Sequence, residues 1–236
     1  MIKAVLFDLD GTLLPVDTGK FAAEYLKEVV KAVSPLVEPA RFKEALLAST
    51  GVVLKSCNPS MTNEEVFWQD FRARLGDIAD ELAPVLDKFY NQRFSVLARL
   101  TNPSQHARAA VQAALDRGLR VAVATQPVFP RVAVLERLSW AGVRDLPWEL
   151  VTCYEEMHCC KPNPYFFAEI AGQLNLQPEQ CLMVGNDVEE DLTAEETGMR
   201  TCLVTDYLIN KNEVEVSTEW SGTLSELAGW LAVAKF

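Results

Sequence analysis

The chain has 236 residues, of which 49% are hydrophobic, and its formal net charge is −11. This length and apolar content allow one large domain, or a domain that carries an inserted partner. The acidic charge and the absence of a long basic run exclude a nucleic-acid groove and an anionic-membrane patch, and no apolar run has the length of a membrane span or the form of a signal peptide.

The predicted elements fall into three blocks. Residues 2–9 form an apolar run that predicts a buried strand. From about residue 18 to 96, apolar residues recur at helical spacing without a strand pattern, which predicts an all-helical block. Strands and helices then alternate. We expect strands at 120–125, 181–185 and 201–204, and helices at 104–117, 131–141, 164–174, 187–197 and from 223 onward.

This order of elements predicts an α/β fold. Strands that alternate with helices form a parallel sheet with right-handed crossovers, so we expect a doubly wound, Rossmann-like core. The helical block is then an inserted cap. We place the core at 1–16 and 99–236 and the cap at 17–98, with linkers at about 15–18 and 99–103.

Acidic side chains stand at the end of the first strand. Asp8 and Asp10 are two residues apart, so they project to the same side of an extended strand, which ends at Gly11. Two carboxylates this close repel unless a cation lies between them or one keeps a proton. An Asp-Gly pair at a strand end is also common in simple turns. Because ligands bind beyond the carboxyl ends of parallel strands, Thr125 and Asp187 are expected to converge on the same edge.

Four segments resemble the motifs of the haloacid dehalogenase superfamily of hydrolases. The first is Asp8-Leu9-Asp10-Gly11-Thr12-Leu13, and it is the most specific. Thr125 after a buried strand resembles the second motif, Lys161 before Pro162 the third, and the stretch from Gly185 to Asp191 the fourth. The helical insertion stands where members with a small helical cap carry theirs.

The resemblance implies a role for each motif residue. Asp8 would attack phosphorus and form an aspartyl phosphate. Asp10 would protonate the leaving oxygen and later activate water, and we expect a raised pKa for Asp10 among these carboxylates. Lys161 and Thr125 would bind phosphate oxygens, and the phosphate is expected to contact the further positions Gln126, Leu9 and Gly11.

The resemblance and the charge balance together imply Mg²⁺. Several carboxylates and a phosphate dianion require a hard cation with oxygen ligands. Its expected ligands are Asp8, the backbone carbonyl of Asp10, and Asp187. Asn186 and Asp191 either support these ligands or replace one of them. The sequence departs from the usual pattern here, because Asn186 stands between Gly185 and Asp187, and Gln126 occupies a position where relatives often have Asn.

Simpler interpretations exist for single residues. Thr125 alone fits a β-branched strand residue, Lys161 a solvated loop lysine, and Asp187 a helix N-cap. Only their order along the chain favours a site. The six cysteines contain no Cys-x-x-Cys pair, which argues against zinc and favours reduced thiols in the cytoplasm.

The expected function is Mg²⁺-dependent hydrolysis of a small phosphorylated metabolite by a monomer or homodimer, without nucleic-acid or membrane partners. A 2-haloacid dehalogenase is disfavoured because such enzymes lack the second acid that Asp10 provides. A phosphonate hydrolase would need a cap lysine, for which Lys20 and Lys55 are candidates. The motifs are also compatible with a sugar-phosphate mutase and with a non-catalytic, receiver-like protein that binds phosphate. The cap residues that could contact a substrate are Arg41, Lys43, Lys55 and Arg72.

Overall fold

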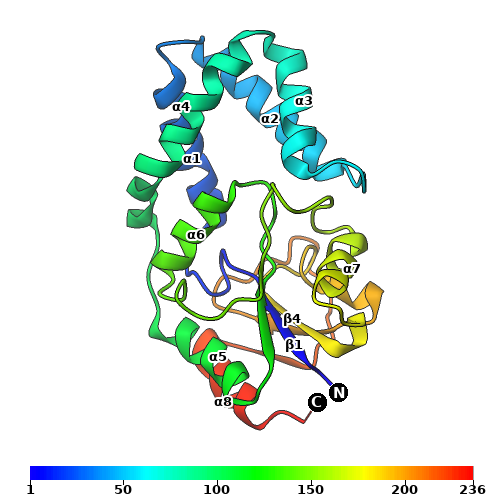
Figure 1. The fold of residues 1–236 in the computed structure, drawn as a ribbon. Helices are drawn as coiled ribbons and strands as arrows, with labels where there is room; N and C mark the ends of the chain where they lie inside the picture. Colours follow the sequence, from blue (N-terminus) through cyan, green and yellow to red (C-terminus); the bar gives the residue numbers. More distant parts are fainter. Residues whose placement is uncertain (236) are drawn as a thin grey trace.

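The core is a six-stranded sheet in which all neighbouring strands are parallel (Figure 1). The computed structural model describes residues 1–235. The strand order is β3-β2-β1-β4-β5-β6. The strands are β1 (Ala4–Phe7), β2 (Arg120–Val123), β3 (Leu150–Val151), β4 (Cys181–Gly185), β5 (Arg200–Val204) and β6 (Trp220–Gly222). This is the doubly wound order that places a ligand site where the winding reverses, between β1 and β4.

Each strand contributes side chains to both faces of the sheet, because successive residues alternate. On one face Val5, Phe7, Val121 and Val123 pack into a large apolar cluster with α5 (Gln105–Asp116) and α8 (Leu224–Val233). On the other face Leu6 and its neighbours pack against α7 (Pro164–Gln173). Helices therefore cover both faces, and the predicted α/β fold is confirmed.

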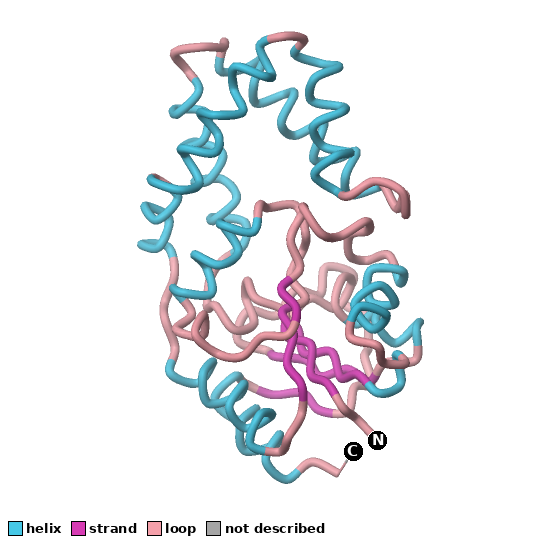
Figure 2. Tube along the Cα trace, viewed as in Figure 1, coloured by secondary structure: helices cyan, strands magenta, loops and turns pink. Residues whose placement is uncertain are grey.

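Most of the chain between β1 and α5 is helical (Figures 1 and 2). They form α1 (Thr18–Val33), α2 (Pro39–Lys55), α3 (Asn63–Leu75), α4 (Ile78–Gln92) and the 3₁₀ segment η1 (Phe94–Leu100). Asp17 and Thr62 cap α1 and α3 with their side chains. We call this helical insertion the cap. In Figure 1 it stands above the carboxyl ends of the strands, at the top of the molecule.

Most predicted elements of the core are present, with one clear exception. Ser104 caps α5, and α6 (Arg131–Trp140) follows β2 as expected. The helix predicted over 187–197 is wrong in its first half. Asp187 forms an isolated bridge with Ile209, residues 188–191 form turns, and only a 3₁₀ segment, η3 (Leu192–Thr197), follows them. The reason is local: the Asp187 and Asp191 carboxylates accept backbone N–H groups and hold this stretch in a turn.

One end of the cap is fastened to the core. Cys57, in the loop between α2 and α3, forms a disulfide with Cys159 of the core. Beside it the backbone N–H of Asn63 donates to the carbonyl of Met157 at 2.7 Å. The expectation that all cysteines are reduced is therefore wrong for this pair. It failed because the two residues lie 102 positions apart and meet only through the fold.

Candidate active site

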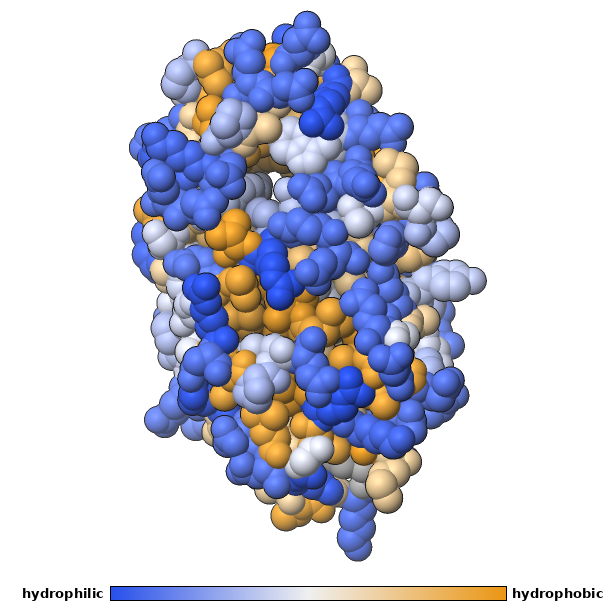
Figure 3. Space-filling view, viewed as in Figure 1, coloured by the Kyte–Doolittle hydropathy of each residue, from blue (hydrophilic) through white to orange (hydrophobic). Residues whose placement is uncertain are grey.

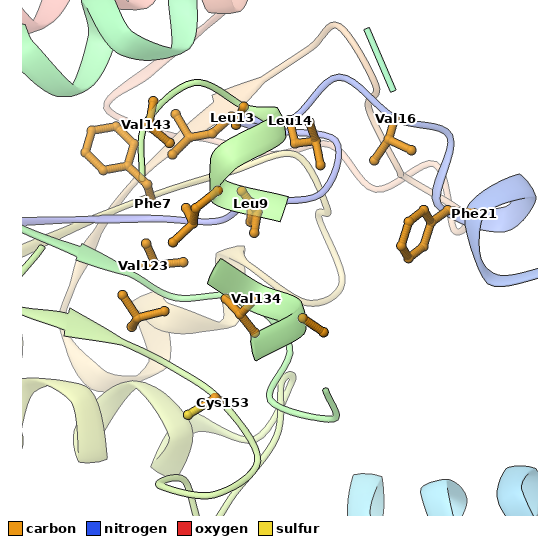
Figure 4. Close-up of a cluster of buried hydrophobic side chains, with 14 of the residues drawn as sticks. Phe7, Leu9, Leu13, Leu14, Val16, Phe21, Val123, Val134, Val143 and Cys153 are labelled. Atoms are coloured by element: carbon orange, nitrogen blue, oxygen red, sulfur yellow. The ribbon is translucent and has the colours of Figure 1, made fainter. Parts of the chain in front are cut away.

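Asp8 stands directly beyond the central strand. Its backbone N–H donates to the carbonyl of Val184 at 2.9 Å, so the ladder between β1 and β4 extends as far as Asp8. Phe7 and Leu9 on either side of it enter the apolar cluster shown in Figure 4. These anchors fix the direction of the Asp8 side chain, and the residue is only 7% exposed. The strand pattern therefore places this carboxylate at the reversal point of the sheet.

Lys161 pairs with two carboxylates. Its Nζ donates to Asp8 Oδ1 at 2.8 Å and to Asp191 Oδ1 at 2.5 Å. Lys161 and Asp191 are both almost fully buried. Burial lowers the pKa of Lys161, but Asp191 and Asp8 more than offset this, so that the pKa is raised and the side chain stays charged. The structure thus brings together three predicted residues from three separate motifs.

Asp191 connects Lys161 to the end of β4. Its Oδ2 accepts the backbone N–H groups of Asn186 at 2.9 Å and of Asp187 at 3.0 Å. Gly185 makes this possible, because a Cβ atom at that position would overlap the Asp191 carboxylate. Asp191 therefore positions the lysine and the turn after β4.

Thr12 and Asn186 complete the support of Asp8. The Thr12 hydroxyl lies 2.9 Å from Asp8 Oδ2 and 2.9 Å from Asn186 Oδ1. Asn186 Nδ2 donates to the carbonyl of Tyr207 at 2.6 Å. In the sequence Thr12 stands out only as part of its motif. A hydroxyl four residues after Asp8, in a tight turn, could nevertheless have predicted a hydrogen bond to the Asp8 carboxylate.

Gly11 has a left-handed backbone, with φ of 89°. An added Cβ atom would lie 2.5 Å from Asn186 Nδ2, so only glycine fits here. The Gly11 N–H donates to the carbonyl of Leu14 at 2.8 Å and is occupied within the turn in this arrangement. The contact of Gly11 with phosphate stays a prediction.

Thr125 and Gln126 follow β2. Thr125 is buried, and the Thr152 hydroxyl donates to its carbonyl at 2.7 Å. The Gln126 side chain bonds the backbone of Lys161 on both sides: its Oε1 accepts from the N–H at 3.0 Å, and its Nε2 donates to the carbonyl at 3.1 Å. In this structure Gln126 therefore positions the lysine segment.

Asp187 lies at the rim of the site and is 8% exposed. Its Oδ1 accepts the backbone N–H groups of Glu189 and Glu190, each at 2.9 Å. The other oxygen, Oδ2, accepts no backbone N–H group from residues 1–235. One oxygen of Asp187 is thus fixed by the turn, and the other is available to a ligand.

Asp10 makes a contact that the sequence does not indicate. It forms an ion pair with Arg137 of α6, whose side chain is 1% exposed. Burial raises the pKa of the Asp10 carboxyl; the Arg137 guanidinium opposes this shift, and the nearby Asp8 charge adds to it. The two residues are 127 positions apart in the sequence. Nothing in the sequence of the helix distinguishes a buried arginine from an exposed one, so this contact could not be predicted.

The carboxyl groups of the site outnumber its buried cations. Burial raises the pKa of Asp10, Asp187, Glu190 and Asp191 alike, and the nearby main-chain N–H groups and positive side chains do not reverse this shift.

An added divalent cation would relieve this excess of negative charge. The donors expected for it, the Asp8 and Asp187 carboxylates and the Asp10 carbonyl, are all hard oxygens of the kind that Mg²⁺ prefers. The residues present therefore fit Mg²⁺. Residues 1–235 contain no cluster of three or more His, Cys, Asp or Glu side chains placed to hold a metal.

A cavity of about 1040 Å³ lies between the cap helices and the loop after β2, and the surface is hollowed in the upper part of Figure 3. Aromatic side chains form much of its wall, including Phe67, Trp68, Tyr90 and Phe129. Of the four basic cap residues singled out in the sequence, Arg72 lines this cavity. None of the predicted catalytic residues does, so the cavity borders the site without containing it.

Comparisons with known proteins agree with this geometry. The family model of haloacid dehalogenase-like hydrolases matches residues 2–195. Over 85% of the chain, it is 27% identical to glyceraldehyde 3-phosphate phosphatase of Methanopyrus kandleri, 83% of which is covered. It is also 25% identical to N-acetylmuramic acid 6-phosphate phosphatase of Pseudomonas aeruginosa, with 86% of this chain and 81% of that protein covered.

Solved structures share the fold. CbbY of Rhodobacter sphaeroides in complex with phosphate superimposes with a TM-score of 0.60 at 20% identity, covering 96% of each chain. A predicted phosphoglycolate phosphatase of Haemophilus somnus gives 0.59 at 18% identity, with 97% of each chain covered. Within residues 1–235 no helix combines the length and the apolar character that crossing a membrane requires. The chain belongs to the haloacid dehalogenase-like hydrolases and is an enzyme of their phosphatase-like group.

Proposed function

We propose that the protein is a Mg²⁺-dependent phosphomonoesterase that acts on a small phosphorylated metabolite through an aspartyl phosphate on Asp8. The observation that carries the proposal is the contact of Lys161 Nζ with Asp8 Oδ1 at 2.8 Å, at the reversal point of the sheet. A buried lysine there holds the carboxylate in place through a charge-assisted hydrogen bond, and its positive charge attracts a phosphate oxygen to the same place.

In this proposal the two aspartates have different tasks. The Asp8 carboxylate attacks phosphorus, and the bond to the leaving oxygen breaks as Asp10 donates a proton to that oxygen. Asp10 then accepts a proton from the water that releases phosphate from Asp8. The raised pKa of Asp10 suits a group that must first hold a proton. Bound Mg²⁺ would supply charge neutralisation for the phosphate and for the carboxylates.

Lys161 and the Thr125 hydroxyl would hold phosphate oxygens, and the cap would limit the access of water and select the leaving group. The relatives named above are a glyceraldehyde 3-phosphate phosphatase and an N-acetylmuramic acid 6-phosphate phosphatase. We infer from them a small phosphorylated metabolite, without choosing between these substrates.

Two related reactions have less support. A phosphonate hydrolase would need a poised cap lysine, but Lys20 is 80% exposed and paired with Asp17, and Lys55 is also exposed. A sugar-phosphate mutase would use the same core residues and return the phosphoryl group to the sugar. Product analysis with a hexose phosphate separates a mutase from a phosphatase, because a phosphatase releases inorganic phosphate.

We also propose a cytoplasmic location and a monomer or homodimer. In that compartment the Cys57–Cys159 disulfide would be an exception, because cytosolic thiols are usually kept reduced.

The direct test is hydrolysis of p-nitrophenyl phosphate with Mg²⁺, with EDTA, and by Asp8→Asn. We expect turnover only with metal, and none from Asp8→Asn. Asp116→Asn is the matched control, because Asp116 is exposed on α5 and its side chain accepts a hydrogen bond from the neighbouring Gln112. Metal-independent turnover, or full activity of Asp8→Asn, would contradict the proposal. No turnover on this substrate or on a panel of phosphorylated metabolites would favour a non-catalytic, phosphate-binding protein.

A further inference from the structure

Arg137 is held in one orientation beside Asp10. Its Nε donates to the carbonyl of Ala133 at 3.3 Å within α6. Its guanidinium carbon lies 4.7 Å from the centre of the Phe129 ring. Stacking on an aromatic face and a main-chain bond together restrict a planar guanidinium. The arginine is thus a rigid element against which a carboxylate can be oriented.

The contact between the two side chains is one-sided. Arg137 Nη1 bonds Asp10 Oδ2, whereas arginine commonly grips a carboxylate with two parallel bonds. Asp10 Oδ1 and Arg137 Nη2 are both buried and have no hydrogen-bond partner among the described residues. Leaving buried polar atoms unpaired costs free energy, so a pair that served stability alone would be expected to close both bonds.

We propose that Arg137 is the positioning residue for Asp10. By holding Oδ2, it turns Oδ1 toward the leaving oxygen of the substrate and toward the attacking water. The inference rests on the proposed function, since it assumes that Asp10 exchanges protons with these groups. It adds a residue of α6, outside the four motifs, to the catalytic arrangement.

The chemistry supports a positional role over a purely structural one. A buried ion pair contributes little net stability compared with apolar residues of similar size, because both charges must be desolvated. A carboxylate that transfers protons, in contrast, depends strongly on its orientation. Lysine would keep the charge at this position but would lose both the planar fork and the stacking on Phe129.

The test is a double-mutant cycle on turnover. In the protein with Asp10 intact, Arg137→Met is expected to lower kcat about 10- to 100-fold while KM changes less than about threefold. In an Asp10→Asn background, the same substitution should change kcat less than about threefold, because there is no longer a carboxylate to orient. Arg131→Met on the same helix is the control, since Arg131 is exposed and pairs with Glu156.

Two further measurements keep the test decisive. Added guanidinium ion should restore part of kcat to Arg137→Ala and none to Arg131→Ala. If Arg137→Met does not fold, two other variants replace it in the comparison. Arg137→Lys keeps a positive charge beside Asp10, and the double variant Asp10→Asn with Arg137→Met removes both charges, so neither variant leaves a buried charge without its partner.

Equal losses in both backgrounds without rescue would show a merely structural arginine and would overturn the inference. The proposed function would survive that result, because it is decided separately by the metal dependence and by Asp8→Asn.

Discussion

Asp191 holds Lys161 in place: its Oδ1 lies 2.5 Å from Lys161 Nζ, while its Oδ2 accepts the main-chain amides of Asn186 and Asp187. The lysine that contacts Asp8 is therefore anchored through one carboxylate to the end of β4. Asp191 of the fourth motif thus positions Lys161 of the third motif, and two substitutions test this relationship independently.

Asp191→Asn should impair both stability and activity. The substitution removes one charge from the buried pair of Asp191 and Lys161. Because Lys161 keeps its second partner, Asp8, we expect a loss of about 3 kcal/mol in the free energy of unfolding. Urea unfolding measures this loss. Asp145→Asn is the control: it breaks an exposed pair with Arg108, and the midpoint should not move. A stable and fully active Asp191→Asn would contradict the anchoring role.

Gly185→Ala tests the same anchor from the main chain. The added methyl group would overlap the Asp191 carboxylate and displace it from Lys161. We expect a loss of kcat/KM of about 10-fold or more with p-nitrophenyl phosphate. Gly172→Ala in α7 is the matched control, because no atom lies within 4 Å of the position of its added Cβ, and alanine favours the helix. Similar behaviour of the two variants would show that the space at Gly185 is not needed.

Prediction from the sequence succeeded where the signal was local. The apolar run at 181–185 predicts the bounds of β4, and the spacing of Asp8 and Asp10 predicts two acids at the end of the central strand. β3 and β6 were not predicted, because strands of two and three residues contain too little alternation to recognise.

The contacts that complete the site were not predictable in the same way. Arg137 reaches Asp10 only through the packing of α6, and Cys57 reaches Cys159 only through docking of the cap. The acidic stretch 187–191 has helical spacing, but its carboxylates bond the local amides and form turns. These features depend on tertiary contacts and on side chains that bond the main chain, and the pattern of a single sequence does not contain that information.

The pH dependence of activity should report Asp10. Burial raises its pKa, so the protonated form that donates to the leaving oxygen persists to higher pH than for an ordinary aspartate. Activity is therefore expected to fall on the alkaline side as Asp10 loses this proton. Asp10→Asn cannot lose a proton there and should have low activity without that limb, whereas Asp116→Asn should retain it. An unchanged alkaline limb in Asp10→Asn would reject the assignment.

The disulfide predicts four free thiols in the oxidised protein, from Cys153, Cys160, Cys181 and Cys202, and six after reduction. Thiol titration under denaturing conditions counts them. Because the bond closes a long loop, its reduction should lower the unfolding free energy by about 2–4 kcal/mol. Cys57→Ser should be insensitive to reductant. Six free thiols without reductant, or equal melting temperatures with and without it, would show that the cap is not covalently tied to the core.

The most direct measurement is the identification of the residue that carries phosphorus during turnover. Acid-quenched enzyme can be treated with borohydride, which reduces an aspartyl phosphate to homoserine, and the modified position is then read by peptide mass spectrometry. The account predicts modification at Asp8 alone, dependent on substrate and Mg²⁺, and none in Asp8→Asn. Modification at another residue, or turnover without any modified residue, would contradict it.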